Sequence, residues 1–374
     1  MAYTTVAKPK SHFDVKTFQG SSSTKTISGV GFKPDMVWIK DRTGANKWGC
    51  YDSNRGVQKW LILSENYSQN GVTDITATST SLASFTSDGF TVSAMSAQPI
   101  NNTNGNQFLT YMWKANGGST SSNDASATSV GTIDSIYQAN TTAGFSIVTY
   151  TGTGSAGTLK HGLSVKPKCI IVKRVNAAEG WEVYHGDDGL VSDPQTDYFE
   201  INTDAGVADS ADRWNDTAPT TAVFSIGTHA GVNTNGSTYI AYVFAETKGF
   251  SNFGTYHGIT DNANGPFVYT GFRPAMVIVK RRDGTESWII QTIAGTKIVK
   301  DNSQGRQGNL IEQKMFLNLG DAENSGGGDV DFYSNGFKPR DTDGVHNWTD
   351  YKYVYIAFAE HPVVGTNGTV GLAF

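Results

Sequence analysis

Short apolar runs alternate with short polar turns along the chain, and three of the apolar runs are alike. Their sequences are GFKPDMVWIK at 31–40, VKPKCIIVK at 165–173 and GFRPAMVIVK at 271–280. In each copy a proline precedes an unbroken apolar run that ends at a lysine. Proline lacks an amide hydrogen and is tolerated at the start of a strand, and a run of this length suits a strand that is buried on both faces. We therefore predict buried core strands at 36–39, 169–172 and 276–279.

A tryptophan follows each of these runs in the same register. Trp48, Trp181 and Trp288 each lie eight residues after the lysine of their own copy (48 − 40, 181 − 173, 288 − 280). The prolines at 34, 167 and 274 are 133 and 107 residues apart (167 − 34, 274 − 167), which is near the usual size of a domain and far longer than a solenoid repeat. We interpret the copies as tandem domains and these tryptophans as structural.

Other parts of the copies also recur. A turn follows the first strand of each copy as TFQG at 17–20, TYTG at 149–152 and TYHG at 255–258, and the hairpin FTSDGF at 85–90 returns as FYSNGF at 332–337. Asp-Gly and Asn-Gly between apolar strands are strong hairpin signals. An aromatic-rich strand then closes each copy. The sequence therefore predicts an all-β protein of three tandem antiparallel β-sandwich domains of the jelly-roll-like type.

These repeats divide the chain into six parts. We place an N-terminal arm at 1–12, repeat 1 at 13–116, a linker rich in Ser, Thr and Asn at 117–143, repeat 2 at 144–248, repeat 3 at 249–361 and a C-terminal tail at 362–374. The arm is either disordered or docked on a neighbour. The linker composition is typical of a flexible tether, so we expect repeat 1 to move relative to a rigid pair formed by repeats 2 and 3.

Composition and charge narrow the range of partners. Charged residues make up 17% of the chain, its net charge is −5 and its pI is about 5.8. The overall charge therefore gives no electrostatic reason to expect binding to nucleic acid. The first ten residues, MAYTTVAKPK, lack the apolar core of a secretory signal, and no apolar run approaches the roughly 20 residues that span a bilayer. We expect synthesis in the cytoplasm, no membrane insertion and no nucleic-acid partner.

The motifs that resemble cofactor or ion sites are incomplete. Residues 152–157 match GxGxxG, but the sequence after them does not predict the helix that a phosphate site requires. Residues 341–344, DTDG, begin like a calcium loop, yet position 352 is Lys instead of the closing Glu. The histidines show no metal spacing, and Cys50 and Cys169 fit packed thiols better than a disulfide. We therefore expect no cofactor and no metal site.

No motif in the sequence identifies catalytic residues. The sequence contains no GxSxG elbow and no HExxH helix. Carboxylate pairs that hydrolyse glycosides meet in space and leave no sequence pattern, so that class stays open. We expect a protein that is not an enzyme.

Three tryptophans lie outside the repeated register. Trp60, Trp214 and Trp348 are near polar loops, and we select them as candidate surface contacts to a ligand, for instance by stacking on sugars. A buried structural position is equally consistent with the sequence.

Several segments together resemble a known group of proteins. They are FKPDMVWIK, FTSDGF, FSIVTYTGTG with VKPKCIIVKR, WNDTAPT, FSIGT, TYIAYVFAETKGFSNFGTYHG and YIAFAEHP. The chain resembles virion structural proteins of marine tailed bacteriophages, which are built on a domain of unknown function and are often described as tail-fibre or tail-associated. Repeat 1 departs most, with Met112-Trp113-Lys114 where the other repeats have Phe-Ala-Glu.

The resemblance implies a non-catalytic structural protein of the virion that contacts the host surface. It also implies a homotrimer whose partners are other virion proteins and a glycan of the host. Because the chain has no obvious coiled coil or long fibrous segment that would make a shaft, a capsid decoration or other virion assembly protein is the alternative. A polysaccharide depolymerase is the less favoured alternative.

Overall fold

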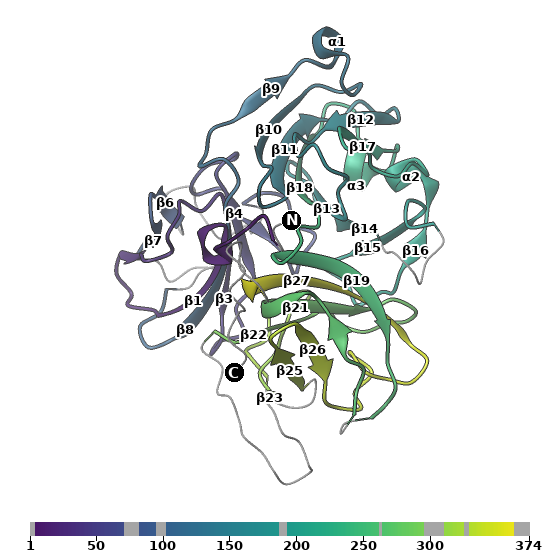
Figure 1. Cartoon of the computed structure of the whole chain (residues 1–374). Coiled ribbons are helices and arrows are strands. Elements are labelled where there is room, and N and C mark those ends of the chain that lie inside the picture. The colour runs from purple at the N-terminus through teal and green to yellow at the C-terminus, as the bar shows by residue number, and fades with distance from the viewer. Residues whose placement is uncertain are drawn as a thin grey trace.

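The chain folds almost entirely into β-structure. The computed structural model describes residues 4–70, 82–94, 102–186, 193–261, 264–294, 310–324 and 329–362. Within these ranges the strands form antiparallel sheets, accompanied by a few short helices (Figure 1). The predicted all-β, antiparallel fold class is confirmed.

Each repeat contributes one large sheet, and the three large sheets share a strand order. The first strand of a repeat pairs with its last strand, the last strand pairs with the core strand, and the core strand pairs with the strand near the repeated tryptophan. The sheet of repeat 1 is β1 (Phe13–Gln19), β8 (Gln107–Trp113), β3 (Met36–Asp41), β4 (Gly49–Asp52) and β5 (Leu61–Ile62). The sheet of repeat 3 is β19 (Ser251–His257), β27 (Lys352–Pro362), β21 (Phe272–Arg281), β22 (Ile289–Thr292) and β24 (Met315–Phe316).

The large sheet of repeat 2 has the same centre and is extended at both edges. In order it is β16 (Ala208–Asp209), β15 (Asp197–Glu200), β14 (Trp181–His185), β13 (Cys169–Arg174), β18 (Thr238–Phe244), β11 (Phe145–Thr151), β10 (Ser135–Asn140) and β9 (Ser121–Asn123). The helices of this part of the chain are α1 (Ala125–Thr128), α2 (Ala211–Trp214) and α3 (Ala230–Asn233).

A smaller sheet belongs to each repeat. In repeat 1 it is β2 (Lys25–Ile27), β7 (Gly89–Val92) and β6 (Leu82–Thr86), and in repeat 2 it is β12 (Gly157–Lys160) and β17 (Val223–Ile226). In repeat 3 it is β20 (Val268–Tyr269), β26 (Gly336–Pro339), β25 (Val330–Tyr333) and β23 (Leu310–Ile311).

The three core strands lie where the repeated motif predicts them. Every residue of 36–39, 169–172 and 276–279 is buried. Pro34 and Pro167 precede their strands, whereas Pro274 lies inside β21 at a point where the pairing register with β27 shifts. A bulge leaves a residue outside the ladder, so it accommodates a proline that has no amide hydrogen to donate.

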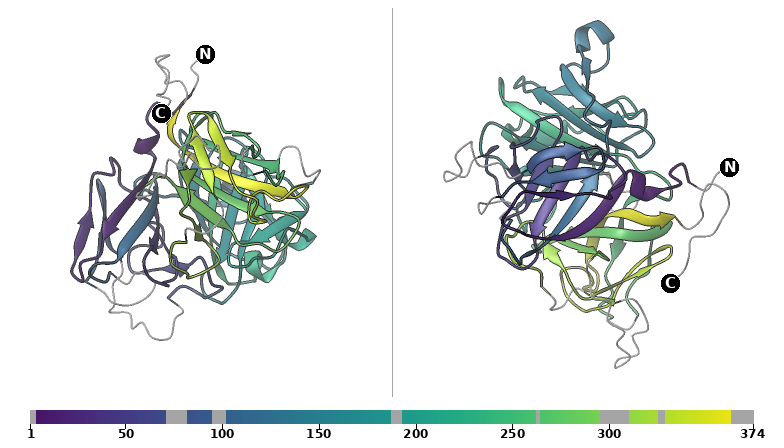
Figure 2. Two further views of the ribbon diagram at one scale, coloured as in Figure 1. Left: turned by 90° about the horizontal axis from the view of Figure 1, so that it is seen from below. Right: turned by 90° about the vertical axis from the view of Figure 1, so that its left-hand side faces the viewer.

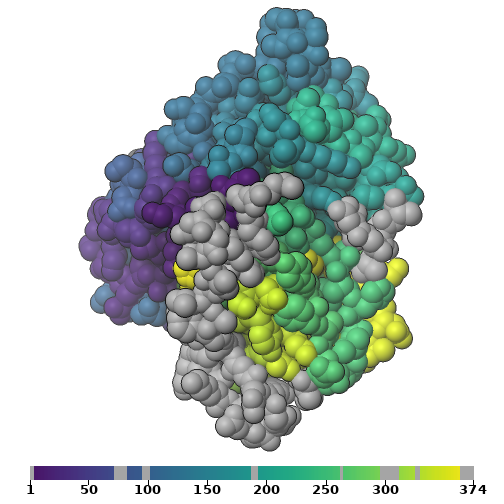
Figure 3. Space-filling view, in the orientation of Figure 1, coloured from purple at the N-terminus to yellow at the C-terminus, as the bar shows by residue number. Residues whose placement is uncertain are grey.

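One apolar core is common to all three repeats. It takes side chains from every large sheet, for example Trp38, Ile171 and Ile278, whereas the opposite face of each large sheet lines a separate core of its own repeat. The large sheets surround this common centre in Figure 1, and repeat 2, in teal, lies against both repeat 1 and repeat 3 in Figure 3. We call this arrangement the three-repeat ring. The division of the chain into three tandem domains stays a prediction.

An aromatic triangle lies inside the common core, with one side chain from each repeat. Trp113, Phe244 and Phe358 are all buried, and their ring centroids are 6.3, 5.8 and 5.8 Å apart, each pair meeting edge to face. Trp113 pairs with Met36 across the sheet as Phe244 pairs with Cys169. Trp113, and not Met112, therefore corresponds to the Phe of the Phe-Ala-Glu segment. The correspondence drawn from the sequence was displaced by one residue.

The repeated tryptophans connect neighbouring repeats in a closed cycle. Each is at most 2% exposed, and each indole nitrogen donates a hydrogen bond to a backbone carbonyl of another repeat. The bonds run from Trp48 to Phe316 of repeat 3 (2.8 Å), from Trp181 to Ile62 of repeat 1 (2.8 Å) and from Trp288 to Glu200 of repeat 2 (2.9 Å). Because three equivalent interfaces close on themselves, the chain has the geometry of a cyclic trimer made from one polypeptide.

A buried asparagine also recurs, which the repeated strand and tryptophan motifs did not predict. The side chain spans two turns by accepting one backbone N–H and donating to two backbone carbonyls. Asn233 accepts from Thr153 N (2.8 Å) and donates to Ser155 O and Gly227 O (both 2.7 Å). The equivalent residues are Asn102 and Asn347, and all three are 0% exposed.

The expected linker is part of the fold. Residues 117–143 contain β9, α1 and β10, and β10 pairs with β11 over its full length. The Gln138 amide nitrogen donates to Ser53 Oγ (2.6 Å) and to Asn54 of repeat 1. Hydrogen bonding to both repeats replaces the flexible tether that the composition predicted.

The N-terminal arm docks on its own chain. Val6 is 2% exposed within the common core, and Thr4 Oγ1 donates to Lys248 O at 2.8 Å. The short η1 helix (Pro9–Ser11) follows, and in Figure 2 this purple segment lies beside yellow β27. The arm therefore helps to cover the common core, at least over residues 4–12. Of the predicted C-terminal tail at 362–374, Pro362 is the last residue of β27, and the other residues lie outside the described part of the chain.

Candidate functional site

Two of the three selected tryptophans are buried, so the prediction of a surface position is wrong for them. Trp60 and Trp214 are each 1% exposed, in the separate cores of repeats 1 and 2. The Trp214 indole donates to Asp197 O at 3.0 Å and meets Tyr184 edge to face. Trp214 is isolated in a polar stretch that does not reveal which way its side chain points, whereas Trp60 begins the apolar run WLIL at 60–63, which was a signal of burial.

Trp348 is 50% exposed in the loop between β26 and β27. Its backbone N–H donates to Tyr353 Oη at 2.9 Å, and Tyr353 in turn donates to Gly344 O at 2.8 Å, so the loop is held firmly. The indole lies 6.4 Å from the Tyr351 ring, and the Arg281 guanidinium sits 3.4 Å from the centre of that ring. Trp348 is thus an exposed aromatic face on a rigid base.

Polar and apolar groups flank this tryptophan. The hydroxyls of Thr260 and Thr349 lie 2.7 Å apart, and Ile259 is 44% exposed. An aromatic face beside hydroxyls and an aliphatic side chain suits a ligand that has one apolar face and several hydroxyl groups. The structure thus places the exposed Trp348 face among groups of the kind that bind sugars.

The other repeats have a threonine at the corresponding position. The backbone carbonyls of Thr103, Thr234 and Trp348 each approach the glycine that ends the first strand of their repeat, and a Cβ on that glycine would lie within 2.4 Å of the carbonyl oxygen. The exposed aromatic face is therefore a feature of repeat 3, added to a turn that all three repeats share.

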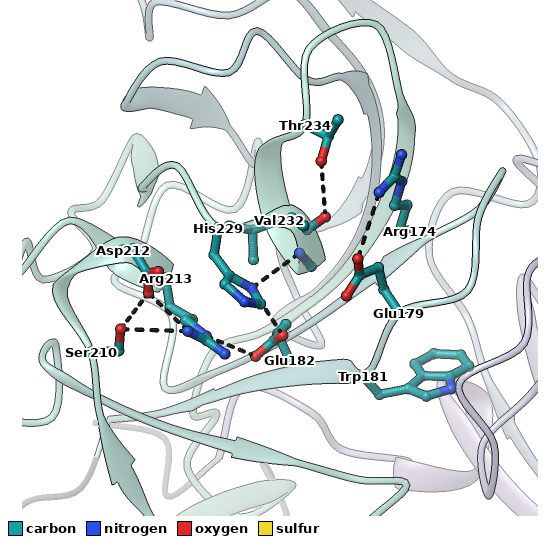
Figure 4. A network of polar contacts seen from close by, with 12 residues as sticks. Arg174, Glu179, Trp181, Glu182, Ser210, Asp212, Arg213, His229, Val232 and Thr234 are labelled. Carbon is teal, nitrogen blue, oxygen red and sulfur yellow. Dashed lines mark hydrogen bonds and ion pairs between the residues drawn. The ribbon is translucent and has the colours of Figure 1, made fainter.

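A network of charged side chains distinguishes repeat 2 (Figure 4). Glu182 on β14 is 0% exposed, and Arg213 of α2 and His229 before α3 both point toward it, with nitrogen–oxygen distances of 3.4 Å. The interaction with Glu182 raises the pKa of His229. A Cβ at Gly231 would lie 2.3 Å from Glu182 Oε1, so only glycine allows this approach.

This network fixes both helices to the sheet. The Arg213 guanidinium also pairs with Asp212 at 2.9 Å and lies 4.0 Å from the Tyr198 ring centre. Removing one member of a buried ion pair leaves an uncompensated charge, which is strongly destabilising. We interpret the network as structural.

Two carboxylates come together in the same region. Glu182 and Glu200 are opposite each other across β14 and β15, and burial together with the Glu182 charge raises the pKa of Glu200. A hydrolytic pair must reach its substrate. Glu182 is fully buried and held by Arg213 and His229, so this pair does not form an accessible acid–base site.

The motifs that resembled cofactor and ion sites have other roles. Residues 152–157 run into strand β12, so a strand follows them in place of the helix that a phosphate site requires. Asp341 is 8% exposed and accepts the backbone N–H of Asp329 and of Asp343, so its carboxylate closes a turn. In the parts of the chain that the structure covers, no group of three or more His, Cys, Asp or Glu side chains is placed to hold a metal ion.

Both cysteines are packed thiols, as predicted. Cys50 and Cys169 are free and fully buried in the common core, and burial raises the pKa of Cys50 to about 12. A thiol with so high a pKa is a poor nucleophile.

The lysine that ends each core strand is buried, and in repeats 2 and 3 its ammonium group donates to a neighbouring repeat, which its position at the strand end did not reveal. Lys40, Lys173 and Lys280 are all 0% exposed. Lys173 donates to Asn66 O of repeat 1 at 3.1 Å, and Lys280 donates to Asp204 O of repeat 2 at 2.9 Å. Burial lowers the pKa of Lys173 to about 7 and those of the other two to about 8.

We expect Lys173→Met to flatten the dependence of stability on pH. The unfolded chain holds the Lys173 proton up to about pH 10, whereas the folded chain releases it near pH 7, so the stability of the wild type rises with pH between these values. The free energy of unfolding is measured in urea at several pH values from 7 to 8.5. Its increase per pH unit should be larger in the wild type than in the variant by up to about 1.4 kcal/mol. The exposed Lys166→Met is the control, and parallel profiles for wild type and Lys173→Met would contradict the assignment.

Within the described residues, no helix is long and apolar enough to cross a membrane. A comparison with curated proteins finds no significant match. A family model described as a domain of unknown function (DUF7483) matches residues 8–362, and this match spans all three repeats as one unit. The chain therefore belongs to the DUF7483 family.

Proposed function

We propose that this chain is a non-catalytic structural protein of a phage particle, in a tail-fibre or tail-associated position where it contacts the host surface. The observation that carries the proposal is the exposed Trp348 on a rigid loop of repeat 3. The repeated tryptophans, together with Lys173 and Lys280, form hydrogen bonds between the repeats, so they hold the scaffold together and leave recognition to the loops. The resemblance of the sequence to phage virion proteins supports the same role.

The three-repeat ring restricts the surfaces through which this chain can form an oligomer. The resemblance implies a homotrimer, but the surfaces that join the repeats are already occupied within one chain. Any association with further copies or with other virion proteins therefore uses surfaces outside the ring interfaces.

We expect purified protein to bind host cells and to block phage adsorption, with Trp348→Ala weakening cell binding about tenfold, which corresponds to about 1.4 kcal/mol. Trp348→Phe should retain most of the binding because it keeps an aromatic face. The control is Tyr269→Ala, which removes another exposed aromatic side chain of repeat 3. Equal binding by wild type and Trp348→Ala would show that Trp348 does not contact the host surface.

Capsid decoration is the second candidate, and the compact form of the molecule favours it. The three repeats pack around one centre, and the described residues include no long helix that would make a shaft (Figure 1). Labelled protein distributed over the phage head, without cell binding, would establish decoration instead. Release of reducing ends from host polysaccharide, abolished by Glu200→Gln, would overturn the non-catalytic assignment.

A further inference from the structure

A cleft of about 560 Å³ lies where repeats 1 and 2 meet. Repeat 1 contributes Arg55, Lys59 and Gln69. The other side follows one end of the large sheet of repeat 2, across strands β9, β10, β11 and β18. The cleft therefore runs across strands instead of along one of them.

The cleft exists because this sheet extends beyond the three-repeat ring. On β10, Gln138 is buried against repeat 1, but Ile136, two residues earlier on the same face, is 46% exposed. Strands β9 and β10 continue past the cover that repeat 1 provides, toward the top of Figure 1. Part of the inner face of the sheet is left open to a ligand.

The side chains that line this open face are rich in hydroxyl groups. Thr151 and Thr238 are paired across β11 and β18, and Thr149 is paired with Ile136 across β10 and β11. Ser122 on β9 is exposed and is paired with Ile136, so its hydroxyl lies on the same face.

The charges in the cleft do not favour an ionic ligand. Arg55 pairs with the buried Asp52 at 2.5 Å, and Asp124 and Asp134 accept backbone N–H groups around α1. Lys59 is then the remaining cation, opposite two carboxylates. Ile136 supplies an apolar surface among the neutral hydroxyls.

We propose that this cleft binds a segment of a neutral, linear polysaccharide. Neighbouring strands are about 4.8 Å apart, close to the length of one sugar unit, so the side chains of successive strands meet successive sugars. The apolar face of a sugar then packs on Ile136 while its hydroxyls meet the threonines and Ser122. This inference rests on the proposed contact with the host surface and adds a second contact site, remote in sequence from Trp348.

The test is calorimetric titration of the full chain with neutral hexasaccharides of β-1,4-linked glucose and of β-1,4-linked mannose, and with an acidic oligogalacturonate. We expect at least one neutral hexasaccharide to bind, and Thr238→Trp or Ile136→Arg to weaken it at least tenfold by filling or charging the cleft. Both positions are exposed, and near-ultraviolet circular dichroism checks that each variant is folded. Tyr269→Ala is the control and should bind like the wild type.

Three results would overturn the proposal: absence of binding to both neutral hexasaccharides, preference for the oligogalacturonate, or equal binding by wild type and both cleft variants. Loss of hexasaccharide binding with Trp348→Ala, but not with Thr238→Trp, would place the sugar at Trp348 and also reject the cleft. Cell binding measured in parallel separates the two proposals. Hexasaccharide binding in the cleft without cell binding would reject the host-surface role alone.

Discussion

We expect Phe244→Ala to lower the free energy of unfolding by about 3–5 kcal/mol, because the substitution leaves a cavity where the three repeats meet. Phe244 is 4% exposed and lies edge to face with Trp113 and with Phe358, and it also stacks on Phe145 at 4.8 Å. The change in unfolding free energy is measured by urea denaturation followed by tryptophan fluorescence and by circular dichroism.

The same experiment tests whether the repeats unfold together. A common core predicts that both probes report one transition in the wild type, with the midpoint moved to lower urea in Phe244→Ala. Phe244→Leu is the matched variant, since it keeps most of the apolar volume and should cost less. A loss below 1 kcal/mol, or separate transitions of which only one responds, would show that the repeats fold independently.

We expect Asn233→Ala to destabilise the protein by about 3 kcal/mol or more. The substitution leaves one backbone N–H and two carbonyls without their partner, and each buried polar group left unpaired costs about 1–3 kcal/mol. Urea midpoints at constant pH measure the effect.

The adjacent motif supplies a closely matched control. Asn235 lies two residues further along the same Asn-Thr-Asn-Gly segment and is exposed, so Asn235→Ala should change stability by less than about 0.5 kcal/mol. Similar losses for the two variants would mean that the turn depends on local asparagine propensity and not on the buried hydrogen bonds.

Local chemistry made part of this fold predictable. The prolines, apolar runs and spaced tryptophans locate the core strands because burial on both faces of a strand leaves a continuous apolar pattern. The buried asparagines also left a signal, since Asn102 and Asn233 both begin an Asn-Thr-Asn-Gly segment six residues before a closing aromatic (108 − 102, 239 − 233). That repeated segment was the available clue to the turn that carries Trp348.

Features that depend on contacts between distant segments were not predictable in this way. The polar composition of residues 117–143 indicated a tether, but pairing with β11 depends on the backbone and needs little apolar side-chain surface. Trp214 lies in a polar stretch and Trp60 follows one, yet tertiary packing turns both inward. The lysine that marks a strand end gave no sign that its ammonium group would contact another repeat.

The closure of the ring within one polypeptide has a consequence for how such a protein changes over generations. In a trimer of identical chains, one altered codon appears at three places around the axis, so every change must be tolerated by all three subunits at once. Here each position around the axis is encoded separately. Repeat 2 can carry the Glu182 network and repeat 3 the Trp348 loop, while the aromatic triangle between them is left unaltered. Mutations can therefore alter one surface loop at a time, while the scaffold keeps the symmetry of a trimer.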